Sequence, residues 1–477
     1  MKKSLALLCA LFAFAHQAAG QEFELGTLYK ADSKFFQIGL LSALDTSWNL
    51  NIFHDHRGQS WEFNSDLERT AVLKTEDIKR KSNFLFHYQI GDTNGFIYEH
   101  RAGINNKEIW LKHDHSDEPV KLLNFNKVRG KFPGVRFELV SDGILVWYSP
   151  IQISDQANSS VHLVEYSARG SQMFNWEISL DKPDKLVRKL RLDIHDGMVF
   201  LTVKQFEASP VEKRAFKANY SYVLYSFPYG SDDVTTHLLH PEGLFPLMPL
   251  VKIEDDHLRS FCFAGKKNNR KQHFLCETKI NMRTSERITE KYDLRKLGLP
   301  RNALTYRWIS RSFYGLRAMS ARTSDSSWTL TAEFRDYRIV GNSASGPVIS
   351  YVFGPIAVIR KDPSGMRASV IEKYQHSTND NATHLSYFSF RTDSSHVFVH
   401  TKSHHYFLGR PWLKSIYKRA NIQVIEMDDQ DLSLQVSELP RLDQKVAPHW
   451  RDAFMRNQEI VVPVSGKKLI GLGKLRP

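Results

Sequence analysis

A short basic segment near the end of the chain combines flat aromatic rings with cations. Residues 408–420 read LGRPWLKSIYKRA, and Pro411 can begin a helix there. Aromatic faces stack on sugar rings, and Lys or Arg side chains beside them attract anionic polymers. We therefore expect this segment to bind a ligand. The residues expected to make the contacts are Trp412, Tyr417, Lys418 and Arg419.

Histidines are frequent, and two His-Asp-His triplets occur at residues 54–56 and 113–115. On a strand, residues two apart point the same way, so each triplet could turn two imidazoles toward one metal ion. The triplets stand at different distances from the nearest turn, however, and both run into polar loops. We interpret them as solvated strand ends and predict no metal site. The run from His396 to His405 is interpreted as strand because it contains Val397-Phe-Val399.

Groups for acid, base or nucleophilic catalysis are present without a distinctive spacing. No serine lies in a Gly-x-Ser-x-Gly turn, and Ser345 stands in a small polar loop. Carboxylates cluster at residues 254–256 and 428–431. Glycosidases need two carboxylates across a cleft, and sequence does not reveal that distance. A calcium loop with its distal Glu is not matched either, so we assign no catalytic residue and no cofactor.

Cys262 and Cys276 are the two cysteines beyond the N-terminal segment. They lie on two strand-like runs joined by the polar loop 264–272, and the midpoint between them, residue 269, falls within that loop. In an antiparallel hairpin they would face each other. We predict a structural disulfide between them, the alternative being two separately buried thiols.

A short Asp-centred turn recurs along the chain at intervals of 47 to 69 residues. Each copy separates two runs rich in aliphatic and aromatic residues, as a hairpin turn does. The copies centre on Asp45, Asp92, Asp142, Asp196, Asp256, Asp325 and Asp393. Self-similarity at such a period indicates a repeat protein, and repeats made of strands and turns are typical of a β-propeller. The Asp is interpreted as turn chemistry, because Asp and Gly tolerate the backbone of tight turns.

The strands around these turns predict an all-β fold. Residues 136–143 (RFELVSDG) and 191–197 (RLDIHDG) nearly superpose, and each is followed by further strand-like runs. A weaker eighth copy of the turn is the stretch 456–459. The strands that follow it lack a partner of their own, while residues 23–29 form a lone strand near the start. Pairing these termini in one sheet would close a ring and remove an exposed edge. We predict seven or eight blades in a single domain over residues 21–477, with a rim insertion at about 402–420. Two β domains meeting near the Pro-rich residues 240–250 are the alternative.

In period, hairpins and aromatic strands, nearly the whole chain resembles β-propeller proteins. The resemblance is to the architecture and not to one family. There is no Gly-Gly doublet of the kelch type and no Gly-His to Trp-Asp pairing of the WD40 type. The Asp-x-Ser-Trp at Asp45 and Asp325 is similar to the Asp-box of sialidase-like propellers, but it lacks the Gly and sets the Trp too close. The resemblance therefore brings no functional residues to this sequence.

The N-terminus has the form of a cleavable signal peptide. Met1-Lys-Lys3 is followed by an apolar run to Ala15 and by small residues at Ala18 and Gly20. We expect cleavage after Gly20 and a mature protein in the periplasm or outside the cell. No later segment has the roughly 18 uninterrupted apolar residues of a membrane span. Formal net charge is +13, or +11 without Lys2 and Lys3.

These observations favour an exported binding protein. A chain this basic is attracted to anionic polymers, and export disfavours nucleic acid. We expect a non-catalytic propeller that binds a macromolecule or glycan, the partner being an anionic glycan or an envelope protein. The alternative is a propeller-type hydrolase or lyase acting on a polysaccharide.

Overall fold

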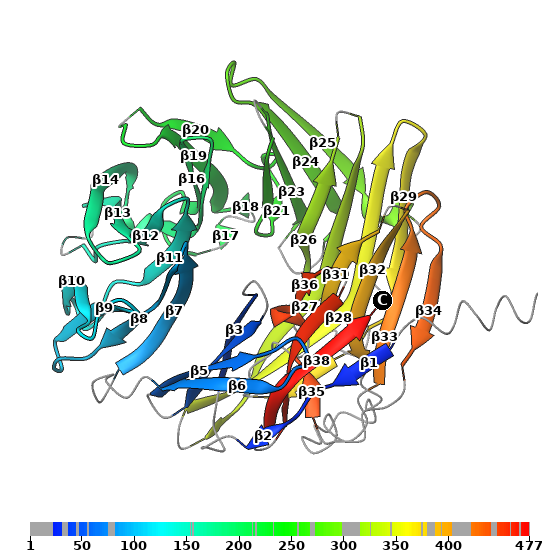
Figure 1. Cartoon of the computed structure of the whole chain (residues 1–477). Coiled ribbons are helices and arrows are strands. Elements are labelled where there is room, and N and C mark those ends of the chain that lie inside the picture. The colour runs from blue at the N-terminus through cyan, green and yellow to red at the C-terminus, as the bar shows by residue number, and fades with distance from the viewer. Residues whose placement is uncertain are drawn as a thin grey trace, which may run out of the picture. The chain divides into compact units, whose positions relative to one another are not determined.

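The computed structural model describes residues 22–476 with gaps. The residues it leaves out inside that range are 31–36, 44–46, 55–56, 75–81, 153, 155–156, 212, 215–216, 232, 255–256, 268–271, 298–314, 325, 344–345, 374, 379–386, 393, 403–420, 440–445, 458 and 467–468. The described part is an all-β structure (Figure 1). Its strands form eight sheets of four or more strands, together with one small hairpin, β17 (Lys213–Arg214) and β18 (Lys217–Ala218).

We number the eight sheets along the chain. The first contains β3 (Gln37–Ala43), β4 (Trp48–His54), β5 (Arg57–Phe63) and β6 (Arg69–Lys74). The second contains β7 (Ser82–Ile90), β8 (Thr93–His100), β9 (Asn106–His113) and β10 (Val120–Asn126). The third contains β11 (Val135–Val140), β12 (Gly143–Tyr148), β13 (Asn158–Ser167) and β14 (Gln172–Pro183). The fourth, after the 3-10 turn η1 (Asp184–Leu186), contains β15 (Val187–His195), β16 (Met198–Phe206), β19 (Tyr220–Pro228) and β20 (Thr235–Leu238).

The later sheets follow the same order with small additions. The fifth contains β21 (Phe245–Pro246), β22 (Leu250–Glu254), β23 (His257–Gly265), β24 (Phe274–Asn281) and β25 (Arg287–Asp293), followed by η2 (Leu294–Lys296). The sixth contains β26 (Gly315–Thr323), β27 (Trp328–Ser343), β28 (Gly346–Asp362), β29 (Gly365–Ile371) and β30 (Gln375–Thr378). The seventh contains β31 (Tyr387–Arg391), β32 (Ser395–Lys402), β33 (Asn421–Asp428) and β34 (Leu434–Glu438).

The eighth sheet joins the two ends of the chain. It contains β35 (Val446–Pro448), η6 (Trp450–Asp452), β36 (Phe454–Arg456), β37 (Glu459–Gly466) and β38 (Leu469–Arg476), with β1 (Glu22–Leu25) and β2 (Tyr29–Lys30). Both β1 and β2 pair antiparallel with β38. The predicted pairing of the terminal strands is therefore confirmed, and the sheets give eight blades.

The described Asp residues of the repeated turn, Asp92, Asp142 and Asp196, each lie between two antiparallel strands of a hairpin. Asp196 and Gly197 both have positive φ, 47° and 71°, as a two-residue hairpin requires. In the sixth sheet, Ser324 N–H donates to the Ser327 carbonyl at 2.8 Å, and Thr392 N–H donates to Ser395 in the same way at 3.0 Å in the seventh. The interpretation of the repeated turn as a hairpin corner is confirmed at Asp92, Asp142 and Asp196, whereas the Asp residues at positions 45, 256, 325 and 393 lie outside the described residues.

Where two sheets of the same unit pack against each other, the middle strands are apolar on the face that the neighbouring sheet covers. In β12, Ile144 and Val146 belong to the core between sheets two and three, while Leu145 and Trp147 belong to the core between sheets three and four. Comparable cores lie between sheets four and five and between five and six. Others lie between sheets seven and eight and between eight and one.

The chain divides into two compact units. One comprises residues 1–78, 336–355 and 371–477, and the other residues 79–335 and 356–370. Residues 240–250, the alternative domain boundary from the sequence, lie inside the second unit. The single domain over residues 21–477 stays a prediction. In the second unit, Figure 1 shows β7 and β11 on the same side of their sheets. The candidate site lies on that side.

Candidate functional site

The four binding residues predicted from sequence lie outside the described residues. Trp412, Tyr417, Lys418 and Arg419 all belong to the stretch 403–420. The binding surface proposed for this insertion therefore stays a prediction.

The cysteine pair is found on opposite strands of one hairpin. Cys262 on β23 stands directly across from Cys276 on β24, as the midpoint of the loop predicted. Both are buried free thiols. A hydrogen bond to Cys276 and complete burial raise the pKa of the Cys262 thiol well above its usual range. The disulfide stays a prediction for the protein in an oxidising compartment.

The second His-Asp-His triplet is a strand end. His113 is buried at the end of β9, and its Nδ1 accepts a hydrogen bond from the His115 N–H at 3.1 Å. Burial lowers the pKa of His113. Within the described residues, no group of three or more His, Cys, Asp or Glu side chains could hold a metal ion. His56 of the first triplet lies outside the described residues, whereas His396 and His400 lie on strand β32 as predicted.

The carboxylates of the acidic run 428–431 accept hydrogen bonds within a turn and form an ion pair. Asp428 accepts hydrogen bonds from the N–H groups of Gln430 and Asp431 at 2.6 and 3.0 Å. Asp429 pairs with Arg391 at 2.7 Å. These contacts indicate carboxylates that stabilise the backbone of a turn. Asp256 and Ser345 lie outside the described residues.

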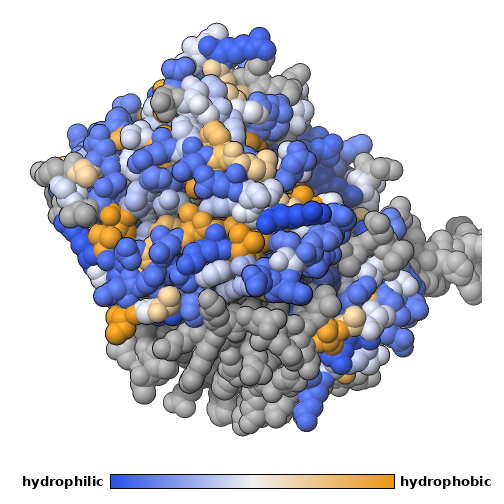
Figure 2. All heavy atoms as spheres, turned by 60° about the vertical axis from the view of Figure 1, so that its left-hand side comes forward, coloured by the Kyte–Doolittle hydropathy of each residue, from blue (hydrophilic) through white to orange (hydrophobic). Residues whose placement is uncertain are grey.

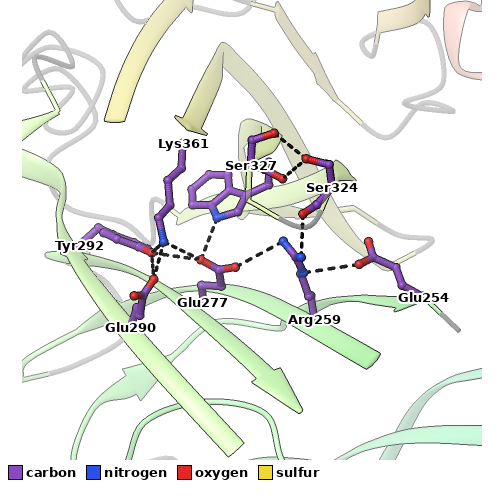
Figure 3. A network of polar contacts seen from close by, with 9 residues as sticks. Glu254, Arg259, Glu277, Glu290, Tyr292, Ser324, Ser327 and Lys361 are labelled. Atoms are coloured by element: carbon purple, nitrogen blue, oxygen red, sulfur yellow. Dashed lines mark hydrogen bonds and ion pairs between the residues drawn. The ribbon is translucent and has the colours of Figure 1, made fainter. Parts of the chain in front are cut away.

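A buried polar network connects the fifth and sixth sheets (Figure 3). Arg259 on β23 lies 3.4 Å from Glu254 and 3.8 Å from Glu277, and it donates to the Ser324 carbonyl at 2.7 Å. Glu277 also accepts from Trp328 Nε1 at 2.7 Å. The network therefore ties the Asp turn of the sixth sheet to the sheet before it. Because its buried members are paired with one another, we assign it to stability.

The outer part of this network is more exposed. Tyr292 donates to Glu277 at 3.0 Å and also contacts Glu290, and Lys361 lies 2.5 Å from Glu290. Hydrogen bonds from Lys361 and Tyr292 lower the pKa of the Glu290 carboxyl. Burial, with these carboxylates, raises the pKa of Tyr292 far above its usual range. Tyr292 thus remains a neutral donor.

The first strands of the sheets in the second unit carry an excess of exposed cations. Among the described residues of β7, β11, β15, β22 and β26, one exposed acidic side chain, Glu138, and two partly exposed ones, Asp193 and Glu254, stand against six exposed basic ones. The six are Arg136, Arg188, Arg191, Lys252, Arg317 and Arg322. We call these six residues the basic set. Strands β22 and β26 contact each other, and Arg136 on β11 donates to the Leu190 carbonyl on β15, so the set lies on two pairs of neighbouring strands.

Two of these strands present the same side chains at equivalent positions. The residue pairs next to the two turns are Val140↔Gly143 and His195↔Met198. Counted back along the strand from these pairs, Glu138 and Asp193 each occupy the third position. Arg136 and Arg191 occupy the fifth position in the same count. Each strand therefore places an Arg and an acid two residues apart, on one side of the strand. We call Arg136, Glu138, Arg191 and Asp193 the Arg–acid quartet.

The two arginines of the quartet are held differently. The Arg136 guanidinium lies 4.9 Å from the centre of the Trp147 ring and donates to the Leu190 carbonyl. The Arg191 guanidinium instead closes on its own neighbour, with Nη2 2.6 Å and Nε 2.8 Å from Asp193 Oδ1. Arg136 is thus oriented by neutral partners, whereas Arg191 is paired with a carboxylate.

Glu138 is the titrating group of this quartet. Desolvation by the surrounding side chains and the negative charge of Asp193 raise the pKa of its carboxyl, while Arg191 and Arg136 act in the opposite direction. A carboxyl with a raised pKa beside a second carboxylate is an arrangement that can act as an acid or as a hydrogen-bond partner. The similarity of residues 136–143 and 191–197 in the sequence aligns these four side chains, but it does not indicate that the packed sheets bring Arg136 to the strand of Arg191.

The surface in Figure 2 is mixed. Small groups of hydrophobic residues lie among hydrophilic ones on the face shown. Exposed large hydrophobic residues of the second unit, such as Ile104, Met173 and Ile288, lie on different sheets or their loops. Within the described residues, no helix has the length and apolar character to cross a membrane.

Comparison with known proteins leaves the family open. No family model matches the chain, and no curated protein matches it. Among solved structures, the WD40 domain of SCAP from fission yeast is 9% identical, with 96% of this chain and 98% of that chain covered and a TM-score of 0.42. The β-propeller domain of the Trilobed protease from Pyrococcus furiosus is 9% identical, covers 86% of this chain and 99% of its own, and has a TM-score of 0.37. Similarity this low carries no functional residue to this chain.

Proposed function

We propose that this chain is an exported, non-catalytic propeller that binds an anionic macromolecule, most directly an anionic glycan, on the first strands of its second unit. The observation that carries the proposal is the basic set, six exposed Arg and Lys residues against the single exposed acid Glu138 among the described residues of those strands. Exposed cations gathered on neighbouring strands raise the local concentration of a polyanion and hold it through many weak ion pairs.

The test measures the binding of dextran sulfate and of neutral dextran to the mature protein. We expect dextran sulfate to bind, neutral dextran not to bind, and the affinity for dextran sulfate to fall as salt is added. Replacing Lys252, Arg317 and Arg322 together with Ser should weaken binding by roughly 3-fold to 150-fold, because three exposed ion pairs contribute roughly 0.2–1 kcal/mol each.

A matched variant removes the same charge elsewhere. Lys127 follows β10, while Arg287 and Lys291 lie on β25, and all three are exposed on or next to the last strands of their sheets. Their joint replacement with Ser should change binding by less than about twofold. Equal losses in the two triple variants would mean that net charge alone attracts the polymer, and the site assignment would then be wrong.

Export is part of the same proposal and is tested separately. A mature N-terminus at Gln21 in protein recovered from the periplasm or the medium would support cleavage after Gly20. Protein that keeps Met1 and stays in the cytoplasm would contradict it.

A polysaccharide hydrolase or lyase is the second candidate. One observation favours it: burial and the nearby charge of Asp193 raise the pKa of the Glu138 carboxyl, and sugar hydrolysis uses two carboxyl groups whose pKa values differ. Release of reducing or unsaturated ends from a polysaccharide, abolished by Glu138→Gln, would support this activity. Intact polymer after prolonged incubation across a panel of glycans would reject it.

A further inference from the structure

We propose that the Arg–acid quartet is a recognition site for a polyuronate, a glycan that carries one carboxylate and free hydroxyls on each sugar. This inference rests on the proposed function and names the class of ligand. The quartet is singled out from the rest of the basic set because it alone alternates Arg and acid at equivalent positions of two neighbouring sheets.

The anchor of the site is Arg136. Its guanidinium is oriented by the Trp147 ring and by the Leu190 carbonyl, both neutral. No carboxylate of the described residues pairs with it at ion-pair distance, so its charge remains available to a ligand. A guanidinium fixed in one plane offers two parallel N–H groups to a carboxylate, and little side-chain freedom is lost when the ligand binds.

The acids of the quartet supply the second half of the recognition. Glu138 lies two residues after Arg136 on the same side of β11. Asp193 contacts Arg191 through Oδ1 in both of their hydrogen bonds. Carboxylate oxygens accept hydrogen bonds from hydroxyls. An Arg next to an acid therefore suits a ligand with a carboxylate next to a hydroxyl.

The repetition of the pair suits a polymer. Arg136 and Glu138 belong to the third sheet, and Arg191 and Asp193 repeat them at the same register in the fourth. A ligand that repeats the same two groups from sugar to sugar can reach the second pair as an intramolecular contact, in which its carboxylate competes with Asp193 for Arg191.

The charge balance of the quartet favours a weakly charged polymer over a densely charged one. Two arginines and two acids add little net charge, so local binding depends on directed hydrogen bonds. A densely sulfated chain would meet the carboxylates of Glu138 and Asp193 as like charges, although it would still be attracted to Lys252, Arg317 and Arg322. The two kinds of polymer should therefore respond to different substitutions.

The experiment measures the binding of polygalacturonate and dextran sulfate to the full mature chain. Arg136→Lys keeps the charge and removes the planar, two-pronged donor. We expect this variant to bind polygalacturonate about tenfold more weakly and dextran sulfate as the unchanged protein does. Glu138→Ala together with Asp193→Ala should weaken polygalacturonate binding and strengthen dextran sulfate binding. Lys127→Ser with Lys291→Ser serves as the control, and melting temperatures confirm that each variant is folded.

The outcomes separate the inference from the proposed function. If dextran sulfate binds and polygalacturonate does not, the polyuronate site is wrong while the anionic-polymer proposal stands. If neither polymer binds, both are wrong. If Arg136→Lys weakens both polymers equally, the quartet contributes charge alone, and the assignment of a directed carboxylate site is overturned.

Discussion

Substituting Glu277 with Ala should destabilise the protein more than the loss of one surface contact would. Glu277 is almost fully buried on β24. It accepts hydrogen bonds from Trp328 Nε1 at 2.7 Å and from the Tyr292 hydroxyl at 3.0 Å, and it lies 3.8 Å from Arg259 and 3.7 Å from Lys361 (Figure 3). Its removal leaves the Trp328 Nε1–H without this acceptor and a buried guanidinium with one carboxylate fewer, while Tyr292 keeps its contact with Glu290.

The size of the effect follows from these contacts. Breaking a buried ion pair by removing one partner typically costs about 3–5 kcal/mol, because the other charge stays buried. Arg259 keeps Glu254 and the Ser324 carbonyl, which places the expected loss near the lower limit, at about 3 kcal/mol. Glu277→Gln keeps one acceptor oxygen, and we expect a smaller loss of about 1–2 kcal/mol.

Glu290 provides the matched control. It contacts the same Tyr292 and Lys361, but about half of its side chain is exposed. Glu290→Ala should therefore cost only about 0–1 kcal/mol. Guanidinium unfolding followed by tryptophan fluorescence measures all three variants, and hydrogen exchange at residues 324–328 reports whether the turn opens locally. Equal midpoints for Glu277→Ala and Glu290→Ala would refute the assignment of the network to stability.

Three further predictions test other parts of the fold. Oxidation of Cys262 and Cys276 to a disulfide should stabilise the chain by about 3 kcal/mol, because it closes a loop of 15 residues. Peptide mapping without reductant detects the bond. Equal free energies of unfolding with and without reductant would contradict the prediction. Gly473→Ala should weaken the terminal closure, because the added Cβ would meet the Phe23 ring at 2.3 Å; proteolysis at the N-terminus that is no faster than in the unchanged protein would refute it. Burial lowers the pKa of His240 to about 4, so its folded form binds fewer protons than its unfolded form, and the protein should lose about 3 kcal/mol as pH falls from 6.5 to 4. His240→Gln should flatten that part of the stability–pH curve, measured by unfolding at each pH, and an unchanged slope would show that His240 does not carry the term.

Local features of the sequence predicted much of the fold. The all-β class followed from alternating runs, and the hairpins followed from turns such as Asp196-Gly197, because side-chain period and turn backbone depend on neighbouring residues. The opposition of Cys262 and Cys276 followed from counting along one hairpin. The pairing of the terminal strands was predicted from unpartnered strands at each end, and the structure confirms it through β1, β2 and β38.

The candidate site was not predicted in the same way. Residues 412–419 were predicted to bind a ligand because cations and aromatic residues are adjacent in the chain there. Arg136 and Arg191 are 55 positions apart in the chain, and only the packing of sheet three against sheet four brings the Arg136 side chain to the Leu190 carbonyl. Glu277 and Trp328 are likewise 51 residues apart.

The strands, the hairpin turns and the repeat could be predicted because each depends on contacts between residues close in the chain. Which charged side chains meet depends on how the sheets pack. Whether an Arg is paired, stacked on a ring or left available depends on the side chains of the neighbouring strand and sheet. Strand register sets which of those side chains lie beside it. For the repeated Asp turn this means a structural role, while the differences between sheets, such as Arg136 beside Trp147, carry the candidate for function.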